Sequence, residues 1–312
     1  MTTEIPVIDF AAFSSEDAVE KQEVSRLIYR ACSEIGFFYG RNLGVSPVLA
    51  ELLFEQLRRF FALPNSVKQQ LPWSGPYSNR GYLGCGQEQL DPAYPGDIKE
   101  TFNVGRETGL KQPERSNRWP SGMEDFRTHV LAFYDACTLA SDRIFEAFAI
   151  ALDLPTDFIV NQHNQQNNIL RLLHYPPVDG VKPDHALRAG AHTDYGSLTL
   201  LFQESGSSGL EVQNGQGEWI AAPALANTIL VNTGDLMEHW TNGLFRSTNH
   251  RVVIPGDDWA SHSRYAAAFF CHPNEDAEIS CIPSCQSSEQ PPRYSTVMAG
   301  EYIRDRIQAS GL

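Results

Sequence analysis

A histidine and an aspartate stand two residues apart in the segment GAHTDYGSLTLL, residues 190–201. In a β-strand, side chains at positions i and i+2 point to the same face, so His192 and Asp194 can bind one metal ion together. The pair alone is weak support, because nine His and 38 acidic residues in 312 positions give about one such spacing by chance. A metal site therefore needs a third ligand from elsewhere in the chain.

His250 is the best candidate for that third ligand, because it lies in a second strand-like run, STNHRVVI. Two His and one carboxylate on one face form the arrangement that leaves open positions on a non-haem Fe(II). His239, in a turn-rich segment, and His174, in a strand pattern, are competitors. Taken one at a time, His192 and His250 can equally be structural or surface histidines.

Two arginines lie in apolar strand patterns, Arg171 in ILRLLHYPP and Arg264 at the start of RYAAAFF. A buried guanidinium requires an anionic partner in place of water. A carboxylate that binds in bidentate fashion is the natural partner, and it can come from an acidic side chain or from a ligand. An internal salt bridge is therefore the alternative interpretation for each arginine.

The elements that must position these residues differ between the two halves of the chain. Residues 1 to about 155 are largely helical in pattern, with Ser14 or Ser15 as the N-cap of the first helix and Ser46 as that of the second. A third helical pattern, long and amphipathic, ends before Pro155. Residues 72–105 are rich in Gly, Pro and Tyr and are predicted to line or cover a site.

From about residue 168 onward, short strand-like segments follow one another at even spacing. Helices followed by seven or more short strands indicate an α+β protein, mainly β, in which helices pack on a sandwich or jelly roll. We expect one domain over residues 1–312. Its parts are a helical support over about 1–155, a β core over about 165–285 and a C-terminal helix over about 295–310.

The composition argues against several classes of function. A formal net charge of -14 argues against nucleic acid as a partner. No apolar run approaches the roughly 20 residues of a membrane span, and the N-terminus has no secretory signal pattern. The six cysteines include no C-x-x-C pair. We therefore expect a cytoplasmic protein with reduced thiols, a monomer or homodimer that acts on a small molecule.

Three motifs, in the order HTDYGSLTLL, NTGDLMEHWTNGLFRSTNHRV and RYAAAFFCHPN, resemble the isopenicillin N synthase-like branch of the Fe(II)/2-oxoglutarate-dependent oxygenases. IPVIDF, GFFYGRNLGV, Gly81-Tyr82 and HYPP fit the same branch, so the resemblance runs from residue 5 to about 306. It implies a bacterial member of the family with a double-stranded β-helix core, the jelly roll, and N-terminal helices packed on it.

The resemblance also implies the roles of individual residues. His192, Asp194 and His250 match the iron ligands, and Arg264 matches the arginine that binds the distal carboxylate of 2-oxoglutarate. With Fe(II), 2-oxoglutarate and O2, such a site couples oxidative decarboxylation to hydroxylation of a small molecule. Desaturation, ring closure and ethylene formation are variants of the same chemistry.

One position departs from the family pattern. Most of the branch has Arg-x-Ser, whose hydroxyl supports the same carboxylate, whereas this chain has Ala266. Bacterial ethylene-forming enzyme resembles this chain in that alanine. The missing hydrogen bond is worth about 0.5–1.5 kcal/mol net, so 2-oxoglutarate remains the expected co-substrate. Tyr175 and Arg171 match strand positions that flank the co-substrate in some members.

Substrate contacts are predicted mainly in the segment 72–105. The candidates are Tyr77, Arg80, Tyr82, Glu100, Phe102 and, in a later strand, Phe270. Glu100 stands where ethylene-forming enzyme has a substrate-binding glutamate, which suggests a cationic guest such as a guanidino or amino compound. The alternatives are a surface ion pair of Glu100 with Lys99 or Arg106, and core packing for Phe270.

Other activities of such a site stay open at the level of sequence. One is an oxidase of the same fold that uses no 2-oxo acid, and another is the ethylene-forming reaction. A zinc hydrolase can use the same two His and one Asp. A metal-dependent binder of small molecules without turnover is the remaining alternative.

Overall fold

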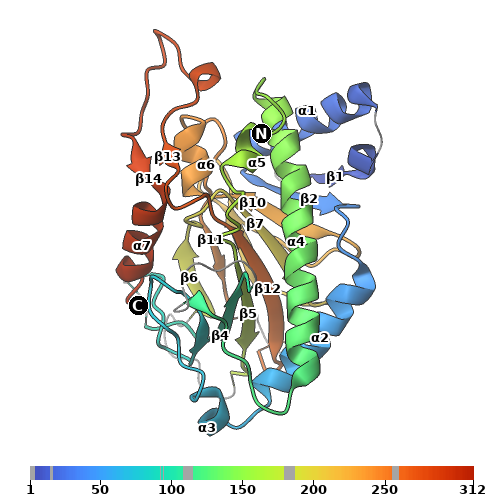
Figure 1. The fold of residues 1–312 in the computed structure, drawn as a ribbon, viewed down its shortest axis with the longest axis vertical. Helices are drawn as coiled ribbons and strands as arrows, with labels where there is room; N and C mark the ends of the chain where they lie inside the picture. Colours follow the sequence, from blue (N-terminus) through green and yellow to red (C-terminus); the bar gives the residue numbers. More distant parts are fainter. Residues whose placement is uncertain are drawn as a thin grey trace.

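Two β-sheets pack face to face in the computed structural model, which describes residues 4–14, 17–91, 93, 95–107, 115–178, 187–254 and 260–312 (Figure 1). The larger sheet has the strand order β1-β2-β10-β7-β12-β5-β4-β3 and the smaller one β6-β11-β8-β9. The strands of the larger sheet are β1 Val7–Asp9, β2 Phe37–Arg41, β3 Gly81–Leu83, β4 Glu100–Gly105, β5 Ile169–Tyr175, β7 Leu198–Gln203, β10 Ile229–Thr233 and β12 Arg264–Cys271. Those of the smaller sheet are β6 Ala189–His192, β8 Leu210–Gln213, β9 Trp219–Ala221 and β11 His250–Val252.

Helices cover the outer face of the larger sheet, where α1, α2 and the long α4 lie together (Figure 1). The strand pair β13 Glu278–Ile279 and β14 Val297–Met298 leads into α7, the C-terminal helix. The helices are α1 Ala18–Glu34, α2 Pro47–Phe61, α3 Asn65–Lys68, α4 Glu124–Ala151, α5 Phe158–Asn161, α6 Asp235–Trp240 and α7 Ala299–Ala309, with short 3-10 turns at Ala11–Ser14 and Pro283–Cys285.

Strand β5 shows why the molecule has two cores. Leu170 and Leu172 point to the helices, whereas Leu173 and Tyr175 point to the smaller sheet. Because successive side chains of a strand alternate between faces, a strand buried on both sides contributes to both cores. The space between the two sheets therefore has an apolar frame, and the polar residues in that space stand out.

The N-terminal half contributes more to the sheets than the sequence pattern predicts. Strands β1 to β4 all belong to the larger sheet, so the expected boundary between a helical support and a β core does not divide the structure. The segment 72–105, predicted as a loop over a site, contains β3 and β4. The segment FFYGRNLG does read as a strand, in agreement with β2, but β1, β3 and β4 give too weak a periodic signal to be recognised without their partners.

Helix boundaries agree with the sequence except at the first N-cap. The cap of α1 is Asp17, whose carboxylate accepts hydrogen bonds from the backbone N–H groups of Val19 and Glu20, so neither Ser14 nor Ser15 caps α1. Ser14 ends the preceding 3-10 turn, and Ser15 lies outside the described residues. Pro47 begins α2 after Ser46, as predicted.

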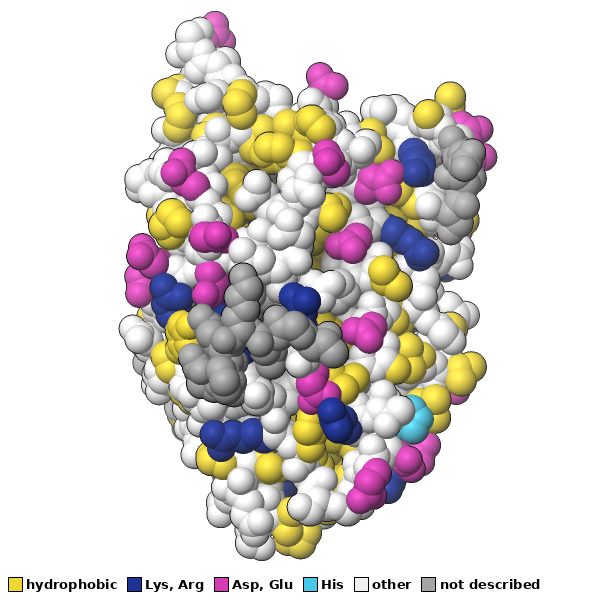
Figure 2. Space-filling view, viewed as in Figure 1, with side chains coloured by type: hydrophobic (Ala, Val, Ile, Leu, Met, Phe, Trp, Pro, Cys, Tyr) yellow, Lys and Arg dark blue, Asp and Glu magenta, His cyan; other side chains and the backbone are white. Residues whose placement is uncertain are grey.

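The predicted α+β fold with a jelly-roll core is confirmed. On the face shown in Figure 2, acidic and basic side chains are interspersed. None of the helices in the described part of the chain has both the length and the apolar character of a membrane span. All six cysteines are free thiols in the structure.

Candidate active site

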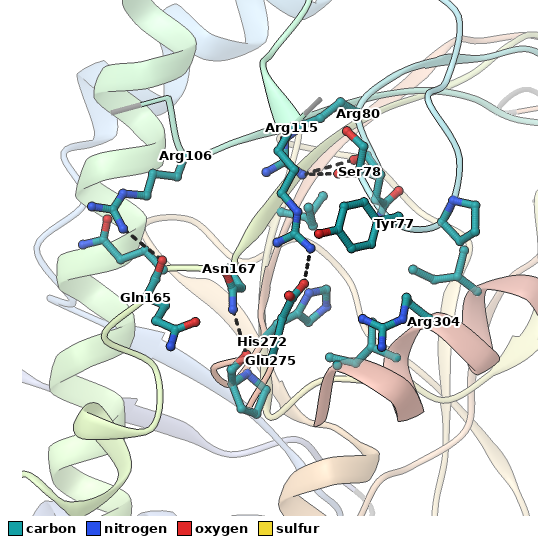
Figure 3. Close-up of a pocket in the computed structure, with 18 of the residues that line it drawn as sticks. Tyr77, Ser78, Arg80, Arg106, Arg115, Gln165, Asn167, His272, Glu275 and Arg304 are labelled. Carbon is teal, nitrogen blue, oxygen red and sulfur yellow. Dashed lines mark hydrogen bonds and ion pairs between the residues drawn. The ribbon is translucent and has the colours of Figure 1, made fainter. Parts of the chain in front are cut away.

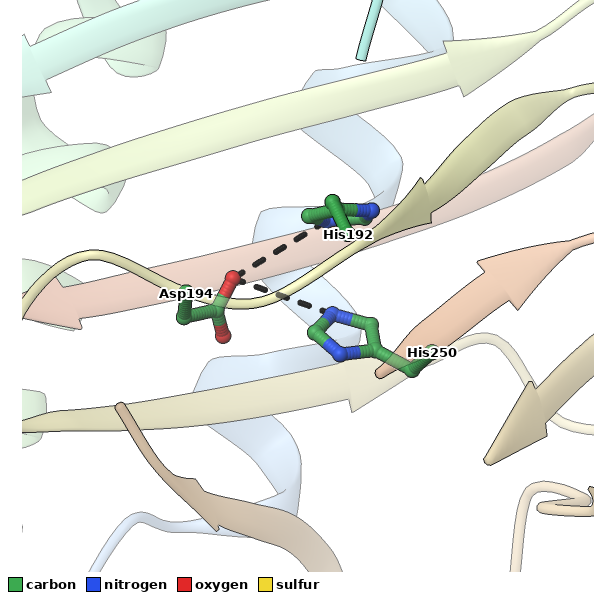
Figure 4. A group of neighbouring side chains, drawn as sticks. All are labelled: His192, Asp194 and His250. Carbon is green, nitrogen blue, oxygen red and sulfur yellow. Dashed lines mark ion pairs between the residues drawn. The ribbon is translucent and has the colours of Figure 1, made fainter. Parts of the chain in front are cut away.

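His192, Asp194 and His250 come together between the two sheets (Figure 4). In the antiparallel pairing of β11 with β6, His250 lies directly opposite His192. Strand β6 ends at His192, so Asp194 belongs to the connection that follows the strand and not to the strand itself. Asp194 Oδ1 lies 3.9 Å from His192 Nε2 and 3.7 Å from His250 Nε2. Strand register thus brings together residues that are 58 positions apart in sequence.

Hydrogen bonds on the far side of each group leave one donor atom free for a metal. His192 Nδ1 lies 2.7 Å from the carbonyl oxygen of Gly190, and His250 Nδ1 lies 3.1 Å from that of Thr248. A carbonyl oxygen only accepts, so Nδ1 carries the proton in both rings and Nε2 keeps its lone pair. The three atoms that remain, two Nε2 and Asp194 Oδ1, fall within a group whose members lie within 4.8 Å of one another.

The second oxygen of Asp194 is held by two donors. Thr199 Oγ1 donates to Asp194 Oδ2 at 2.6 Å, and Asn232 Nδ2 donates to the same oxygen at 2.8 Å. These hydrogen bonds fix the rotation of the carboxylate so that Oδ1 faces the two imidazoles. Thr199 and Asn232 were not predicted from the sequence, since each is one ordinary polar residue in an apolar strand.

Burial and the neighbouring groups together keep His192 and Asp194 in the protonation states that a bound cation requires. Burial and the neighbouring His250 lower the pKa of His192 to about 3, so its imidazole is neutral at pH 7. Burial works to raise the pKa of Asp194, but the two imidazoles and the hydrogen bonds from Asn232 and Thr199 lower it overall. Two imidazole nitrogens and one carboxylate oxygen suit Fe(II), for which they are a known ligand set.

A cavity of about 110 Å³ extends from these three residues between the sheets to Arg264 at the start of β12. The Arg264 side chain is buried at 3% exposure, and its Nη2 donates to Gln203 Oε1 at 3.0 Å. Its Nε and Nη1 have no hydrogen-bond partner among the described residues, and its guanidinium lies over the Tyr175 ring at 4.7 Å. A buried guanidinium with two free N–H groups fits the carboxylate of a ligand.

Arg171 has the internal partners that the alternative interpretation predicts. Its Nη1 donates to Glu88 at 2.9 Å and its Nε to Asn103 at 3.0 Å. Glu88 is also bound by Lys99, which in turn pairs with Asp97 at 2.7 Å. Burial works to raise the pKa of Glu88, but Arg171 and Lys99 lower it overall. The two basic and two acidic side chains of this network therefore neutralise one another at the cavity wall. Glu88, Lys99 and Asp97 were not predicted, because nothing local distinguishes them from solvent-exposed loop charges.

Of the predicted substrate residues, Phe270 alone lines the cavity that holds the metal-binding group, as far as the described residues show. Glu100 and Phe102 of β4 pair with His174 and Leu172 of β5, on the side that faces the helices. Glu100 accepts hydrogen bonds from Lys68, Tyr82 and His174, which leaves it no free oxygen for a substrate. This placement argues against substrate contact by Tyr82, Glu100 and Phe102, because each points away from the cavity.

Tyr77 and Arg80 line a second, neighbouring cavity (Figure 3). Asn79, His272 and Ile307 line both cavities, so the two adjoin. The competing histidines lie elsewhere: His239 stacks on Tyr294 at 4.2 Å, and His174 belongs to the helix-side cluster. The C-terminal helix α7 also borders the site, through Ile307. The sequence did not predict this contact, because the helix lies far from the metal-binding residues along the chain.

Comparisons with known proteins agree with this geometry. Residues 163–273 match the 2OG-Fe(II) oxygenase superfamily, and residues 5–122 match the N-terminal family of the non-haem dioxygenase in morphine synthesis. A 2-oxoglutarate-Fe(II) type oxidoreductase of Metarhizium rileyi is 31% identical over 97% of this chain and 90% of its own length. A 2-oxoglutarate-dependent dioxygenase of Aspergillus niger is 32% identical over 92% of this chain and 89% of its own.

Solved structures extend the comparison to three dimensions. A full-length Neurospora crassa protein in complex with alpha-KG (2-oxoglutarate) and thymine superposes with a TM-score of 0.89 at 35% identity, over 98% of this chain and 96% of that one. A 2OG-Fe(II) oxygenase family protein from Caulobacter crescentus has a TM-score of 0.87 at 29% identity, over 99% of both chains. The chain therefore belongs to the 2OG-Fe(II) oxygenase superfamily, and it is a non-haem dioxygenase that uses Fe(II), 2-oxoglutarate and O2.

Proposed function

We propose that His192, Asp194 and His250 bind the Fe(II) of this dioxygenase, that Arg264 binds the distal carboxylate of 2-oxoglutarate, and that the substrate is a small planar molecule with carbonyl groups. The observation that carries the first two assignments is the set of atoms left without partners among the described residues. Both Nε2 atoms and Asp194 Oδ1 lie close together, and Arg264, whose Nε and Nη1 have no partner among the described residues, lines the same cavity.

Bound Fe(II) supplies the oxidation: with O2, 2-oxoglutarate is converted to succinate and CO2 while one oxygen atom enters a C–H bond of the substrate. The protein positions the reactants. Gln203 and the Tyr175 ring fix the Arg264 guanidinium from two sides, so the co-substrate is held at its far end. The apolar walls of the two sheets keep the reacting atoms away from bulk water.

Other polar groups in the lining of the same cavity support a carbonyl-bearing substrate. Asn79 Oδ1 already accepts hydrogen bonds from Trp73 and Asn103, which leaves its amide N–H groups to donate into the cavity. The Arg171 guanidinium lies 5.7 Å from the Phe270 ring, beside a flat apolar surface. Donors next to an aromatic ring fit a planar heterocycle with carbonyl oxygens.

The neighbouring structures support the same class of substrate. The Neurospora crassa protein, 35% identical to this chain, has been solved with thymine and with 5-formyluracil, both planar rings with two or more carbonyl oxygens. A cationic guanidino compound, the guest predicted from Glu100, has less support because that carboxylate is occupied on the other face of the sheet. The likeness to ethylene-forming enzyme stays a prediction.

Anaerobic reconstitution tests the metal and co-substrate assignments. Addition of Fe(II) and then 2-oxoglutarate to the wild-type protein is expected to give a weak absorption band in the visible region, and His192→Ala is expected to lose both the band and Fe(II) affinity. A His192→Ala variant that binds iron as well as the wild type would show the triad assignment to be wrong. His239→Ala, a histidine outside the cavity, is the matched control.

Succinate release in air then tests the substrate class. Thymine, uracil and related pyrimidines are expected to stimulate succinate release well above the rate without substrate, whereas free arginine and other guanidino compounds are expected to have little effect. Stimulation by guanidino compounds and not by any pyrimidine would overturn the proposed class.

A further inference from the structure

The second cavity, beside the metal-binding group, is large and lined by an unusual number of arginines. It encloses about 410 Å³ and shares Asn79, His272 and Ile307 with the cavity that holds the metal-binding group. The two cavities therefore adjoin along these three residues. We call this larger space the outer cavity.

Four guanidinium groups and one carboxylate line the outer cavity (Figure 3). They belong to Arg80, Arg106, Arg115, Arg304 and Glu275. This is a formal excess of three positive charges in a chain that has 24 basic against 38 acidic residues and a net charge of -14. The lining of the outer cavity is therefore positively charged, whereas the chain as a whole is negatively charged.

Most of these arginines are held without a matching anion from the described part of the chain. Arg80 is 4% exposed, and its Nη1 donates to the backbone carbonyls of Ser78 and Asn79. Arg106 Nη1 donates to the carbonyl of Gln165 at 3.0 Å. Carbonyl oxygens accept hydrogen bonds but do not neutralise charge. These contacts therefore orient the guanidinium groups and leave their positive charge uncompensated.

Several nitrogen atoms of the same groups have no partner among the residues that the structure describes. The Nε atoms of Arg80, Arg106 and Arg115 are buried without a hydrogen bond. Arg115 pairs with Glu275 and lies 4.4 Å above the Tyr77 ring, so one of the four arginines has an acidic partner. For Arg304, on α7, no hydrogen bond or ion pair to another described residue is found.

We propose that the outer cavity binds an oxyanion group of the substrate, a carboxylate or a phosphate, while the carbonyl-bearing end reaches the metal-binding group past Asn79, His272 and Ile307. Oriented guanidinium groups are the preferred protein partners of both oxyanions. The inference rests on the proposed function for the position of the oxidised end. The oxyanion site itself depends on the outer cavity alone.

Direct binding tests the oxyanion site without any turnover. Acetate and methyl phosphate are the two probes, titrated calorimetrically at low ionic strength into the anaerobic enzyme saturated with Fe(II) and 2-oxoglutarate, so that Arg264 is already occupied. We expect one probe to bind with one-to-one stoichiometry, and the tighter of the two identifies the oxyanion as carboxylate or phosphate.

Three variants separate the outer cavity from nonspecific charge effects. Arg304→Gln is expected to weaken the probe by about fivefold or more, and Glu275→Gln, which removes the one carboxylate, is expected to tighten it by about threefold. Arg26→Gln removes the same charge from an exposed position on α1 and is expected to change nothing. Opposite shifts from two neighbouring residues cannot come from a general loss of fold.

Two results would overturn the oxyanion site. One is the absence of binding by both probes, and the other is binding that neither Arg304→Gln nor Glu275→Gln changes. Either result, together with succinate release on neutral pyrimidines, would leave the proposed function intact. Conversely, probe binding that shifts as expected, without succinate release on any carbonyl compound, would keep the site and reject the proposed substrate class.

Discussion

Two buried polar groups of opposite kinds lie beside strand β5, one on its helix side and one on its cavity side. On the helix side, His174 and its neighbour Glu100 form a cluster with Lys68 and Tyr82 in which the carboxylate has a partner on both oxygens. On the cavity side, next to Tyr175, Arg264 keeps two N–H groups without partners among the described residues.

Buried polar residues that stabilise the fold thus differ from those available to bind a ligand. A buried polar group without a partner costs free energy, so a cluster that serves only the fold is closed on itself. Buried polar groups that lack a hydrogen-bond partner in the protein indicate a place where a ligand supplies that partner. By this criterion we propose that Glu100 belongs to the fold and Arg264 to the site, although the sequence alone predicted ligand contact for both.

The largest expected effect on stability comes from removing the Glu100 carboxylate from its cluster with Lys68, Tyr82 and His174. Glu100→Ala leaves Lys68 buried at 3% exposure without its carboxylate, and breaking a buried ion pair in this way costs about 3–5 kcal/mol of unfolding free energy. Chemical denaturation measures this loss. The KM for 2-oxoglutarate is expected to stay within about twofold, and a large rise in KM with unchanged stability would contradict the assignment of Glu100 to the fold.

Arg264→Met is expected to show the reverse pattern: a large rise in the KM for 2-oxoglutarate and little change in stability. The loss of charge-assisted hydrogen bonds worth about 1.5–3 kcal/mol raises the KM for 2-oxoglutarate by roughly 10- to 100-fold. The unfolding free energy of the ligand-free protein is not expected to fall comparably, since two of the N–H groups of Arg264 have no partner there among the described residues. A variant that loses several kcal/mol of stability and keeps its KM would place Arg264 in the fold instead.

His163 offers a pH test on the helix side. Its imidazole stacks on Phe145 at 4.1 Å and contacts Ser197 Oγ at 3.0 Å, and burial lowers its pKa from 6.5 to about 4. The unfolded chain therefore binds more protons than the folded one between pH 6.5 and 4. Stability from this group is present above pH 6.5 and is lost as the pH falls, by at most about 1.4 kcal/mol per pH unit.

The variant His163→Gln removes this titration while keeping a polar side chain. Its unfolding free energy is expected to depend less on pH than that of the wild type between pH 6.5 and 4, as measured by denaturant titrations at several pH values. Equal slopes for the two proteins would show that another group governs the acid sensitivity.

The smallest effect is expected from Ala266→Ser, which restores the hydroxyl common in the family. Ala266 is fully buried, and Gln203 already accepts a hydrogen bond from Arg264 at 3.0 Å. A new hydroxyl adds at most one hydrogen bond, about 0.5–1.5 kcal/mol, so the KM for 2-oxoglutarate is expected to fall by no more than about tenfold. A rise in KM would show that the site has no room for the hydroxyl.

The sequence by itself determined the candidate metal ligands and the fold class. The spacing of His192 and Asp194, the third ligand His250 and an arginine at the start of an apolar strand all follow from residue type and order. Each signal is weak by itself, and only their occurrence together with the ordered motifs that resemble the oxygenase family made the set specific.

The tertiary structure decided which face each of the other residues occupies. A shift of one residue reverses the face, so Glu100 and Phe102 point to the helices while Asn103 points toward Arg171, and only the pairing of β4 with β5 sets that register. The partners of Arg171 and the four arginines of the outer cavity come from segments far apart in sequence. Such contacts depend on how the chain folds back on itself, and no local pattern encodes them.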